Sequence, residues 1–279
     1  MTTATATVAG HTTAARPGNR ASLALLDALT ITWRNLIAIT RIPEALFFST
    51  LQPVMFVLLF RYVFGGAIQI PGVPYRNFMM AGIFVQTMAF GSMGTAIGLS
   101  EDLTKGLIER FRSLPMARSA VLAGRTTADL VRNVFVLVLM TGVGYGVGFR
   151  IGNGVARFLG ACLILLLFSY ALAWVFALVG LSAPNPETAQ VMAFPILFPL
   201  TFASGAFVPV ASMPGPLRAF ARNQPVNAVI DAARALMVHL PSGLQAQSTS
   251  VLVLKALAWI GGILVVFVFF SVRKYRKVA

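Results

Sequence analysis

The side chains that most often carry catalysis are scarce in this sequence. Its two histidines, His11 and His239, have no spacing that could form a zinc motif. None of the four lysines follows a glycine, so the Gly-Lys-Ser/Thr loop that binds ATP phosphates is absent. The Gly-x-Ser-x-Gly signature of hydrolases is absent as well. We therefore expect no catalytic residue, no metal site and no cofactor bound by the chain itself.

One short segment, residues 101–114, combines charge with helical spacing. If this segment is a helix, one of its sides is an apolar stripe of Leu103, Leu107, Phe111 and Leu114. The opposite side is a charged ladder of Glu101, Lys105, Glu109 and Arg112. Such a ladder is usually a solvated face, but a short amphipathic helix between two membrane spans also suits docking of a soluble partner. The residues alone leave both interpretations open.

A second group of charges falls within or beside apolar runs, where charge often marks a transport path. Arg61 and Lys255 lie near the ends of such runs, where a long side chain can reach the membrane interface. Asp129 and Arg132 are three residues apart, so they can pair on one helix face. We interpret them as a structural pair rather than a relay. The lack of an acidic residue at mid-depth argues against proton-driven transport.

The elements that carry these residues are membrane spans. Hydrophobic residues make up 57% of the 279 residues and charged residues only 11%, whereas soluble domains are about a quarter charged. A span needs about 20 residues, and the apolar runs predict six spans, at 45–64, 77–99, 127–149, 158–181, 191–208 and 251–272. The fold class is therefore an all-α polytopic membrane protein. The single cysteine, Cys162, lies in an apolar run and is interpreted as a packing residue.

The segments outside the spans complete a single transmembrane domain, 20–279, behind a disordered tail, 1–19. Residues 20–44 have the spacing of a basic amphipathic helix that lies in the membrane interface, or of an extension of the first span. Residues 100–126 form a charged loop. In the long segment 209–250, Pro225 separates two stretches of helical spacing, which predicts a helical hairpin that re-enters the membrane and caps the pathway.

The distribution of basic residues predicts the orientation. Thirteen Lys and Arg residues lie in the N-terminal segment, the 100–126 loop and the C-terminal tail, against six on the other side. Because short cytoplasmic loops collect positive charge, both termini are expected in the cytoplasm. The net charge of +14 fits anionic lipid headgroups between apolar runs better than nucleic acid. Four glycines, Gly142, Gly144, Gly146 and Gly148, predict a close helix contact in the third span.

Two blocks of sequence resemble a known family. The first is Glu101-Asp102-x-x-Lys105-Gly106-x-x-Glu109-Arg110-x-Arg112-x-x-Pro115. It is similar to the cytoplasmic loop of type-2 ABC transporter permeases, in particular the daunorubicin-resistance subfamily of drug and lipid exporters. The second is Phe207-x-Pro209-x-x-x-Met213-Pro214-x-x-Leu217, followed by Asn223-x-Pro225-x-Asn227 and Arg234. It is similar to the external segment between the fifth and sixth spans of that family.

This resemblance, over roughly residues 20–277, implies the function. It implies a plasma-membrane exporter of a hydrophobic drug or lipid, in which a second copy or a related permease completes the pathway. Separate ATPase subunits would bind MgATP and dock on a coupling helix. The ATPase-coupling residues implied are Glu101, Asp102, Lys105, Gly106, Glu109, Arg110 and Arg112. The external gate implied comprises Phe207, Pro209, Met213, Pro214 and Pro225.

The residues that line the pathway are less specific in the sequence. Met88 and three phenylalanines of the fifth span, Phe194, Phe198 and Phe202, suit a bulky amphiphile. Ordinary packing within the spans explains the same residues. Polysaccharide export, a non-transport membrane scaffold and a lipid-modifying enzyme remain as alternative functions, and an adjacent gene for an ATPase would separate transport from the last two.

Overall fold

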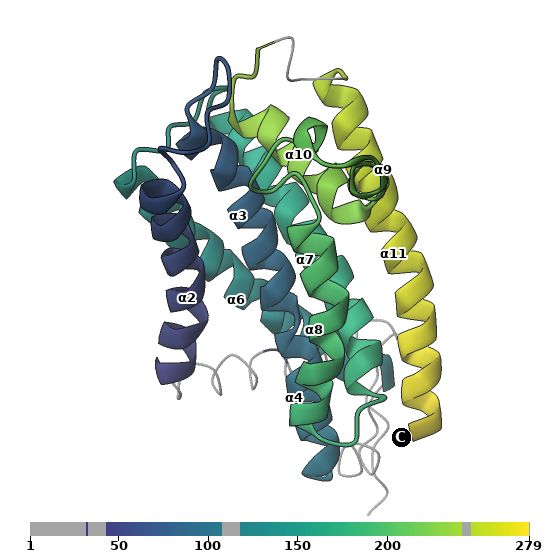
Figure 1. Cartoon of the computed structure of the whole chain (residues 1–279). Coiled ribbons are helices and arrows are strands. Elements are labelled where there is room, and N and C mark those ends of the chain that lie inside the picture. Colours follow the sequence, from purple (N-terminus) through teal and green to yellow (C-terminus); the bar gives the residue numbers. More distant parts are fainter. Residues whose placement is uncertain (1–31, 33–42, 108–117, 242–246, 279) are drawn as a thin grey trace, which may run out of the picture.

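The structure, a computed structural model, describes residues 32, 43–107, 118–241 and 247–278, and its regular elements in these ranges are helices (Figure 1). In chain order they are α2 (Pro43–Leu58), η1 (Leu59–Val63), α3 (Tyr75–Ser92), α4 (Gly94–Thr104), α6 (Arg118–Gly146), α7 (Val155–Gly180), α8 (Pro186–Phe202), η2 (Val210–Ser212), α9 (Gly215–Arg222), α10 (Pro225–Met237) and α11 (Thr249–Val278). The predicted all-α class is thus confirmed for the described residues. The tail and most of the expected interface helix lie outside them.

Within the described residues, four helices are long and apolar enough to cross a membrane. They are Tyr75–Thr104, Leu122–Gly146, Val155–Gly180 and Thr249–Lys277, which match the second, third, fourth and sixth predicted spans. The first predicted span corresponds to α2 and η1, of which Thr50–Val63 counts as a shorter apolar helix. The fifth corresponds to α8, which has 17 residues. The chain is a multi-pass membrane protein, and six spans remain a prediction.

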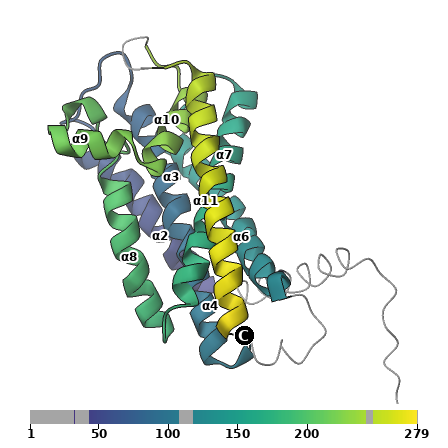
Figure 2. The same ribbon diagram turned by 90° about the vertical axis from the view of Figure 1, so that its right-hand side faces the viewer.

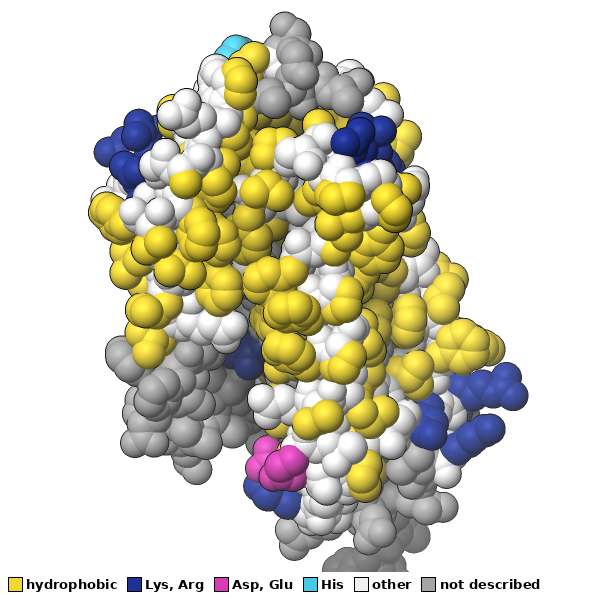
Figure 3. All heavy atoms as spheres, in the orientation of Figure 1, with side chains coloured by type: hydrophobic (Ala, Val, Ile, Leu, Met, Phe, Trp, Pro, Cys, Tyr) yellow, Lys and Arg dark blue, Asp and Glu magenta, His cyan; other side chains and the backbone are white. Residues whose placement is uncertain are grey.

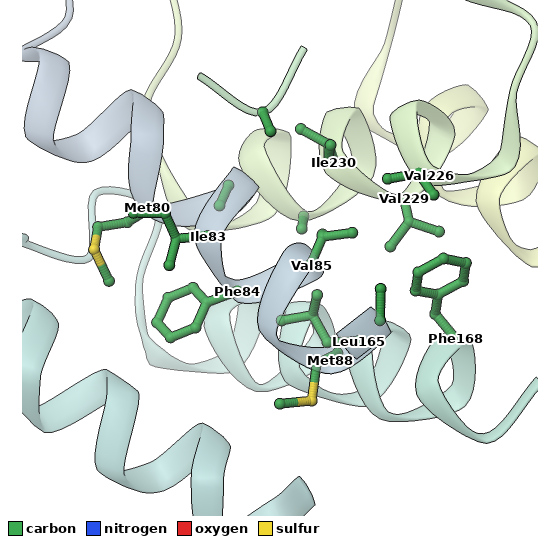
Figure 4. Close-up of a cluster of buried hydrophobic side chains, with 14 of the residues drawn as sticks. Met80, Ile83, Phe84, Val85, Met88, Leu165, Phe168, Val226, Val229 and Ile230 are labelled. Atoms are coloured by element: carbon green, nitrogen blue, oxygen red, sulfur yellow. The ribbon is translucent and has the colours of Figure 1, made fainter. Parts of the chain in front are cut away.

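Helix α7 occupies the centre of the bundle, in contact with α3, α4, α6, α8, α10 and α11. Its sequence is apolar almost throughout, as expected for a helix that is covered on most sides. Figure 4 shows the core where α3, α7 and α10 meet, with Phe84 of α3, Phe168 of α7 and Val229 of α10 fully buried. The chain thus brings a short helix, α10, into the interior of the bundle.

The two ends of the bundle hold different parts of the chain. Helices α9 and α10 lie at the end opposite the C-terminus, whereas the end of α4, the start of α8 and the C-terminus share the other end (Figures 1 and 2). The expected two short helices divided at Pro225 are present as α9 and α10. Between the ends, the face in Figure 3 is largely hydrophobic, with Lys and Arg gathered near its margins. This distribution suits a bilayer.

One of the four expected glycines makes a close contact, because a Cβ at Gly144 would stand 2.7 Å from Met80 Cε of α3, whereas the closest approaches to a neighbouring backbone lie at other glycines. A Cβ at Gly142 or Gly146 would meet no atom of another described segment within 4 Å, so these two positions make no close helix contact in the described part of the chain. A Cβ at Gly180 would stand 2.5 Å from the carbonyl oxygen of Ala96, and one at Gly82 would overlap the backbone of Ala206. The close approaches therefore join α7 to α4, and α3 to the segment that follows α8.

Candidate functional site

A polar cluster lies between α4 and α6. Its core is Asp129, whose side chain is 2% exposed and which accepts a hydrogen bond from Thr95 Oγ1 at 2.6 Å. Arg132 Nη2 lies 3.6 Å from Asp129 Oδ1, so the predicted pair is present. Arg125 lies between two carboxylates, with Nε 3.9 Å from Asp129 Oδ2 and Nη1 4.0 Å from Asp102 Oδ2. Two acids and two bases therefore form one chain of ion pairs inside the bundle.

Three glycines make room for this cluster. Gly91, Gly94 and Gly98 follow at spacings of three and four, so they lie on one side of the α3–α4 helix. A Cβ at Gly94 would stand 2.8 Å from Arg132 Nη1, one at Gly91 would stand 2.5 Å from Asn133 Oδ1, and one at Gly98 would overlap the Arg125 guanidinium. The polar side chains of α6 thus lie directly against the backbone of α3 and α4.

The predicted coupling helix differs from the observed backbone. The helix of the second span continues through Glu101 and Asp102 to Thr104, and Lys105 forms its C-cap. It stops there because Gly106 adopts φ +67°, a left-handed conformation that commonly ends helices at glycine. One continuous helix from residue 101 to residue 114 is therefore wrong. Glu109, Arg110 and Arg112 lie outside the described residues.

The exposed part of the predicted ladder is small. Glu101 and Lys105 lie at the surface and form an ion pair at 2.5 Å, and the carboxylate raises the pKa of Lys105. Asp102, which the resemblance implies as a coupling residue, is not part of this exposed surface, because its side chain is buried against Arg125. Leu103 packs against a buried cluster that includes Leu99 and Trp174, so this part of the apolar stripe faces the interior of the permease.

A cavity of about 210 Å³ lies between α2, α3–α4 and α6, next to the polar cluster. Its lining residues are Gln52, Pro53, Phe56, Ile83, Gln86, Thr87, Phe90, Gly91, Met93, Gly94, Ile97, Arg132, Asn133 and Val136. In the space-filling view, the surface between α2 and α8 is hollowed and a basic side chain is visible there (Figure 3). The cavity joins an apolar wall to a polar one, the arrangement typical of sites for small amphiphiles.

The polar wall of the cavity was not among the predicted features. Gln52 and Gln86 stand alone in apolar spans, and an amide in that setting is a signal for a lined cavity. Asn133 bonds Ser169 Oγ through its Nδ2 at 2.5 Å, while its Oδ1 has no hydrogen-bond partner among the described residues. Arg132 was weighed only as the partner of Asp129, yet it also lines the cavity.

The predicted lining residues lie beside the cavity or away from it. Phe194, Phe198 and Phe202 stack along α8, with ring centroids 5.4 and 4.5 Å apart. The ring centroids of Phe194 and Phe90 lie 6.3 Å apart, and those of Phe202 and Phe56 lie 6.2 Å apart. Phe90 and Phe56 both line the cavity. The three rings therefore border the cavity rather than line it.

Met88 is not a lining residue in this structure. Its side chain is fully buried, and Figure 4 shows it in the core with Val85 and Leu165. The apolar character that suggested a ligand surface therefore serves packing of α3. No face of Met88 remains for a ligand within this chain.

The predicted gate residues follow one another at the end of the bundle opposite the C-terminus. Phe207 stacks on Phe60, with centroids 4.0 Å apart and planes 7° from parallel. Pro209 and Pro214 directly precede η2 and α9, and Pro225 begins α10. Met213 is buried, and its carbonyl accepts two hydrogen bonds from the Arg218 guanidinium. These residues shape the turns between short helices.

Arg234 of α10 connects α3 to the segment that follows α8 at this end of the bundle. Its guanidinium is buried, donates to the carbonyls of Gly205 at 2.6 Å and Phe78 at 3.3 Å, and lies 3.6 Å from the centre of the Phe78 ring. Asn227 Oδ1 accepts a hydrogen bond of 2.8 Å from the backbone N–H of Gly205. The segment after α8 is thus held by α3 on one side and α10 on the other. Both residues were quoted in the sequence block, but without this role.

Comparison with known proteins decides the family. The profile described as ABC-2 type transporter matches residues 27–238, which is most of the chain. The chain belongs to the ABC-2 type transporter family. The resemblance found in the sequence is thereby confirmed, and the chain is a permease subunit rather than an enzyme.

Relatives of this ABC-2 permease include named resistance proteins. The daunorubicin resistance ABC transporter permease protein DrrB1 of Streptomyces coeruleorubidus is 34% identical, over 85% of this chain and 87% of the relative. The doxorubicin resistance ABC transporter permease protein DrrB of Mycobacterium tuberculosis is 26% identical, over 55% of this chain and 53% of the relative. The probable doxorubicin resistance permease DrrC of the same organism is 28% identical, over 54% of each chain.

Proposed function

We propose that this permease forms part of the membrane pathway of an ATP-driven exporter for a hydrophobic or amphiphilic compound. The observation that carries the proposal is the cavity between α2, α3–α4 and α6, which lies in a membrane-embedded ABC-2 permease and combines aromatic, aliphatic and polar walls. Relatives named for daunorubicin and doxorubicin resistance support a drug as the exported compound. Because the sequence lacks a nucleotide loop, MgATP is bound and hydrolysed by separate ATPase subunits.

The pathway would be completed by a second permease, either a copy of this chain or a related one. Large apolar side chains remain exposed on α2 with η1 and on α8, the segments that flank the hollowed face. They include Met55 of α2, Tyr62 of η1, and Phe194 and Phe198 of α8. Lipid covers such side chains around the rest of the bundle. At the hollowed face, a second permease would close the cavity and leave the phenylalanines of α8 on the shared pathway.

The topology proposed has six spans with α9 and α10 on the external side and both termini in the cytoplasm. Its test is labelling of single cysteines in a Cys162→Ala background. We expect an impermeant maleimide to label Ser212→Cys, next to α9, in intact cells, and to label Ser182→Cys only after lysis. Both serines are exposed, so accessibility in the folded chain does not limit the reaction. Labelling of Ser182→Cys alone in intact cells would reverse the assigned orientation.

Force from the ATPase would reach the cavity through the polar cluster. Glu101 and Lys105 offer a charged surface at the end of α4, and the next residue, Asp102, pairs with Arg125. Arg125 and Arg132 share Asp129, and Arg132 lines the cavity. A displacement of the end of α4 would therefore act on a continuous chain of ion pairs that ends at the cavity wall. Nucleotide can drive such a change only if the ATPase binds one permease state more tightly than the other.

The coupling role is tested by exchanging the two exposed charges. We expect Glu101→Lys and Lys105→Glu each to reach the membrane at wild-type levels, because an exposed pair contributes little to folding. Each variant should lose most of the co-purified ATPase. The double exchange, Glu101→Lys with Lys105→Glu, restores the internal ion pair but still presents reversed charges, so it should also fail to bind. Arg157→Glu is the matched control and should bind normally, because Arg157 is exposed in the first turn of α7, close to Asn153, which donates a hydrogen bond to the Ala235 carbonyl of α10. If the double exchange recovers the ATPase, the pair stabilises only the helix end and the docking role is wrong.

A further inference from the structure

A second cavity lies at the α9–α10 end of the bundle. It has a volume of about 630 Å³ and lies between α10, the end of α9 and the first turns of α11. Its charged lining residues are Arg222, Asp231, Arg234 and Lys255. In Figure 3, basic side chains gather at the upper right, in the region of α9 in Figure 1, above a largely hydrophobic face. This cavity therefore combines both signs of charge at one end of a membrane-spanning bundle.

The positive charges of this wall outnumber the negative charge. Three basic residues and one acidic residue line the cavity. The Arg234 guanidinium is buried, donates to two backbone carbonyls and pairs with Asp231. Lys255 is exposed, and one of the three N–H donors of its ammonium is directed to the carbonyl of Arg222 at 3.2 Å. Lys255 therefore keeps donors for an anion, while Asp231 balances the buried guanidinium.

Asp231 is the carboxylate of this wall, and part of it stays open. Its side chain is 36% exposed. Its Oδ1 lies 3.6 Å from Arg234 Nη1, and its Oδ2 accepts a hydrogen bond of 2.9 Å from Asn227 Nδ2. A carboxylate has about four acceptor sites, so it can accept further hydrogen bonds. Partial burial raises the pKa of Asp231, although the charges of Arg234 and Lys255 oppose this rise. A further cationic donor would thus stabilise its charged form.

The position of Lys255 along α11 places the cavity at the level of lipid headgroups. Helix α11 has 30 residues, which corresponds to about 45 Å and matches the roughly 40–45 Å of a bilayer with its headgroup regions. Lys255 lies about 9 Å from the start of α11 at Thr249. The headgroup region on each side of the hydrocarbon core is about 5–7 Å thick. Lys255 is therefore near the boundary between headgroups and hydrocarbon, where phospholipids carry their phosphate.

An apolar stripe continues from Lys255 toward the middle of the bilayer. Trp259, Val266 and Phe270 lie on the same side of α11 as Lys255, because each follows it by close to a whole number of helical turns. All three are exposed. A Cβ at Gly262, between Trp259 and Val266, would meet no atom of another described segment within 4 Å. An acyl chain can thus lie along this stripe, whereas a free phosphate would gain nothing from it.

We propose that the cavity binds the phosphoethanolamine headgroup of a phospholipid from the leaflet at this end of the bundle, which is the outer leaflet in the proposed topology. The phosphate pairs with Lys255, the primary ammonium donates to Asp231, and an acyl chain follows the stripe on α11. Charge-assisted hydrogen bonds are about twice as strong as neutral ones. The ammonium of phosphatidylethanolamine carries N–H donors, whereas the quaternary ammonium of phosphatidylcholine has none. The site therefore discriminates between two lipids of equal net charge, whatever compound the permease exports.

The test uses quenching of Trp259, which lies one helical turn from Lys255 toward the middle of the bilayer. Full-length permease is reconstituted in vesicles with phosphatidylcholine as the major lipid and phosphatidylethanolamine as the minor lipid, and either lipid carries brominated acyl chains. The difference between wild type and Trp259→Phe isolates the fluorescence of Trp259. We expect phosphatidylethanolamine to bind this site roughly fivefold or more tightly than phosphatidylcholine, with the N,N-dimethyl analogue, which keeps one N–H, between them. Quenching in proportion to bulk composition would overturn the proposal.

Two variants assign the selectivity to the cavity. Asp231→Asn should erase the preference for phosphatidylethanolamine over phosphatidylcholine, because the ammonium loses its carboxylate. Lys255→Gln should lower the preference for either phospholipid over brominated diacylglycerol, which has no phosphate. Arg157→Gln changes an exposed arginine in the first turn of α7, outside the lining of this cavity, and should behave like the wild type. A full preference for phosphatidylethanolamine in a folded Asp231→Asn variant would show that the carboxylate does not select the headgroup. If that variant fails to fold, the comparison of methylated headgroups on the wild type decides alone.

Soluble glycerophosphoethanolamine, the same headgroup without acyl chains, separates a lipid site from a site for a free phosphate ester. We expect it not to displace brominated phosphatidylethanolamine, because it gains no contact with the stripe on α11. Displacement at equal concentration would overturn the lipid assignment. ATP-driven transport by the permease with its ATPase subunits is measured separately. Transport without headgroup selectivity would reject this inference alone, and selectivity without association of an ATPase would reject the export function alone.

Discussion

Arg234→Met should remove most of the folded permease from the membrane. The substitution keeps much of the side-chain volume but leaves the carbonyls of Gly205 and Phe78 without their donor. It also removes the cation above the Phe78 ring and the partner of Asp231, which lies 3.6 Å away. Breaking a buried charge network of this kind costs about 3–5 kcal/mol. That cost is a large fraction of the stability of an ordinary domain.

Arg222→Met is the matched control, because Arg222 is exposed at the same end of the bundle. Size-exclusion profiles and thermal unfolding of the detergent-solubilised protein report the outcome. We expect the control to behave like the wild type, and Arg234→Met to aggregate or to unfold at a much lower temperature. Adding Asp231→Asn should recover only part of the loss, since both carbonyls remain unpaired. Normal folding of Arg234→Met would show that α10 is held by its apolar contacts alone.

The apolar runs predicted the four long apolar helices of the described residues, because burial in lipid depends on the composition of a whole segment, which can be read locally. The ends of the helices were harder to place. Glu101 and Asp102 begin a charged stretch, yet the helix of the second span continues through them. It does so because Asp102 forms an ion pair with Arg125 and Leu103 packs against an apolar cluster. Burying an unpaired carboxylate at the end of a span costs free energy, and Arg125 of α6 offsets this cost for Asp102.

The candidate site was predicted less well, for a related reason. Sequence patterns identify apolar and charged side chains but not the side of a bundle on which each one lies. Met88 and Phe90 are two residues apart and equally apolar, yet Met88 is in the core and Phe90 lines the cavity. The polar wall joins Gln86 of α3 to Asn133 of α6, and the distance between two helices is not written in the local sequence of either. The sequence motifs therefore identified the family but did not locate the cavity.

Gly82→Ala is expected to destabilise the permease strongly, although alanine is the better helix former by about 1 kcal/mol. A Cβ at this position would overlap the backbone of Ala206, including its carbonyl oxygen. The segment cannot easily withdraw, because Gly205 is held by Arg234 through its carbonyl and by Asn227 through its amide. Overpacking against rigid backbone costs about 1–3 kcal/mol or more. The substitution should therefore separate α3 from the end of α8 and lower the unfolding temperature.

Gly142→Ala is the matched control because it is the same chemical change in another spanning helix, α6, where no atom of another described segment lies within 4 Å of the new Cβ. At this position the substitution changes only the helix propensity, so the free energy of unfolding should stay the same or rise slightly. The two variants should thus shift the unfolding temperature in opposite directions, measured side by side in the same detergent. A loss confined to Gly142→Ala would indicate that α6 meets a second permease closely at that position. It would also give Gly142 the contact role that the spacing of these glycines predicts.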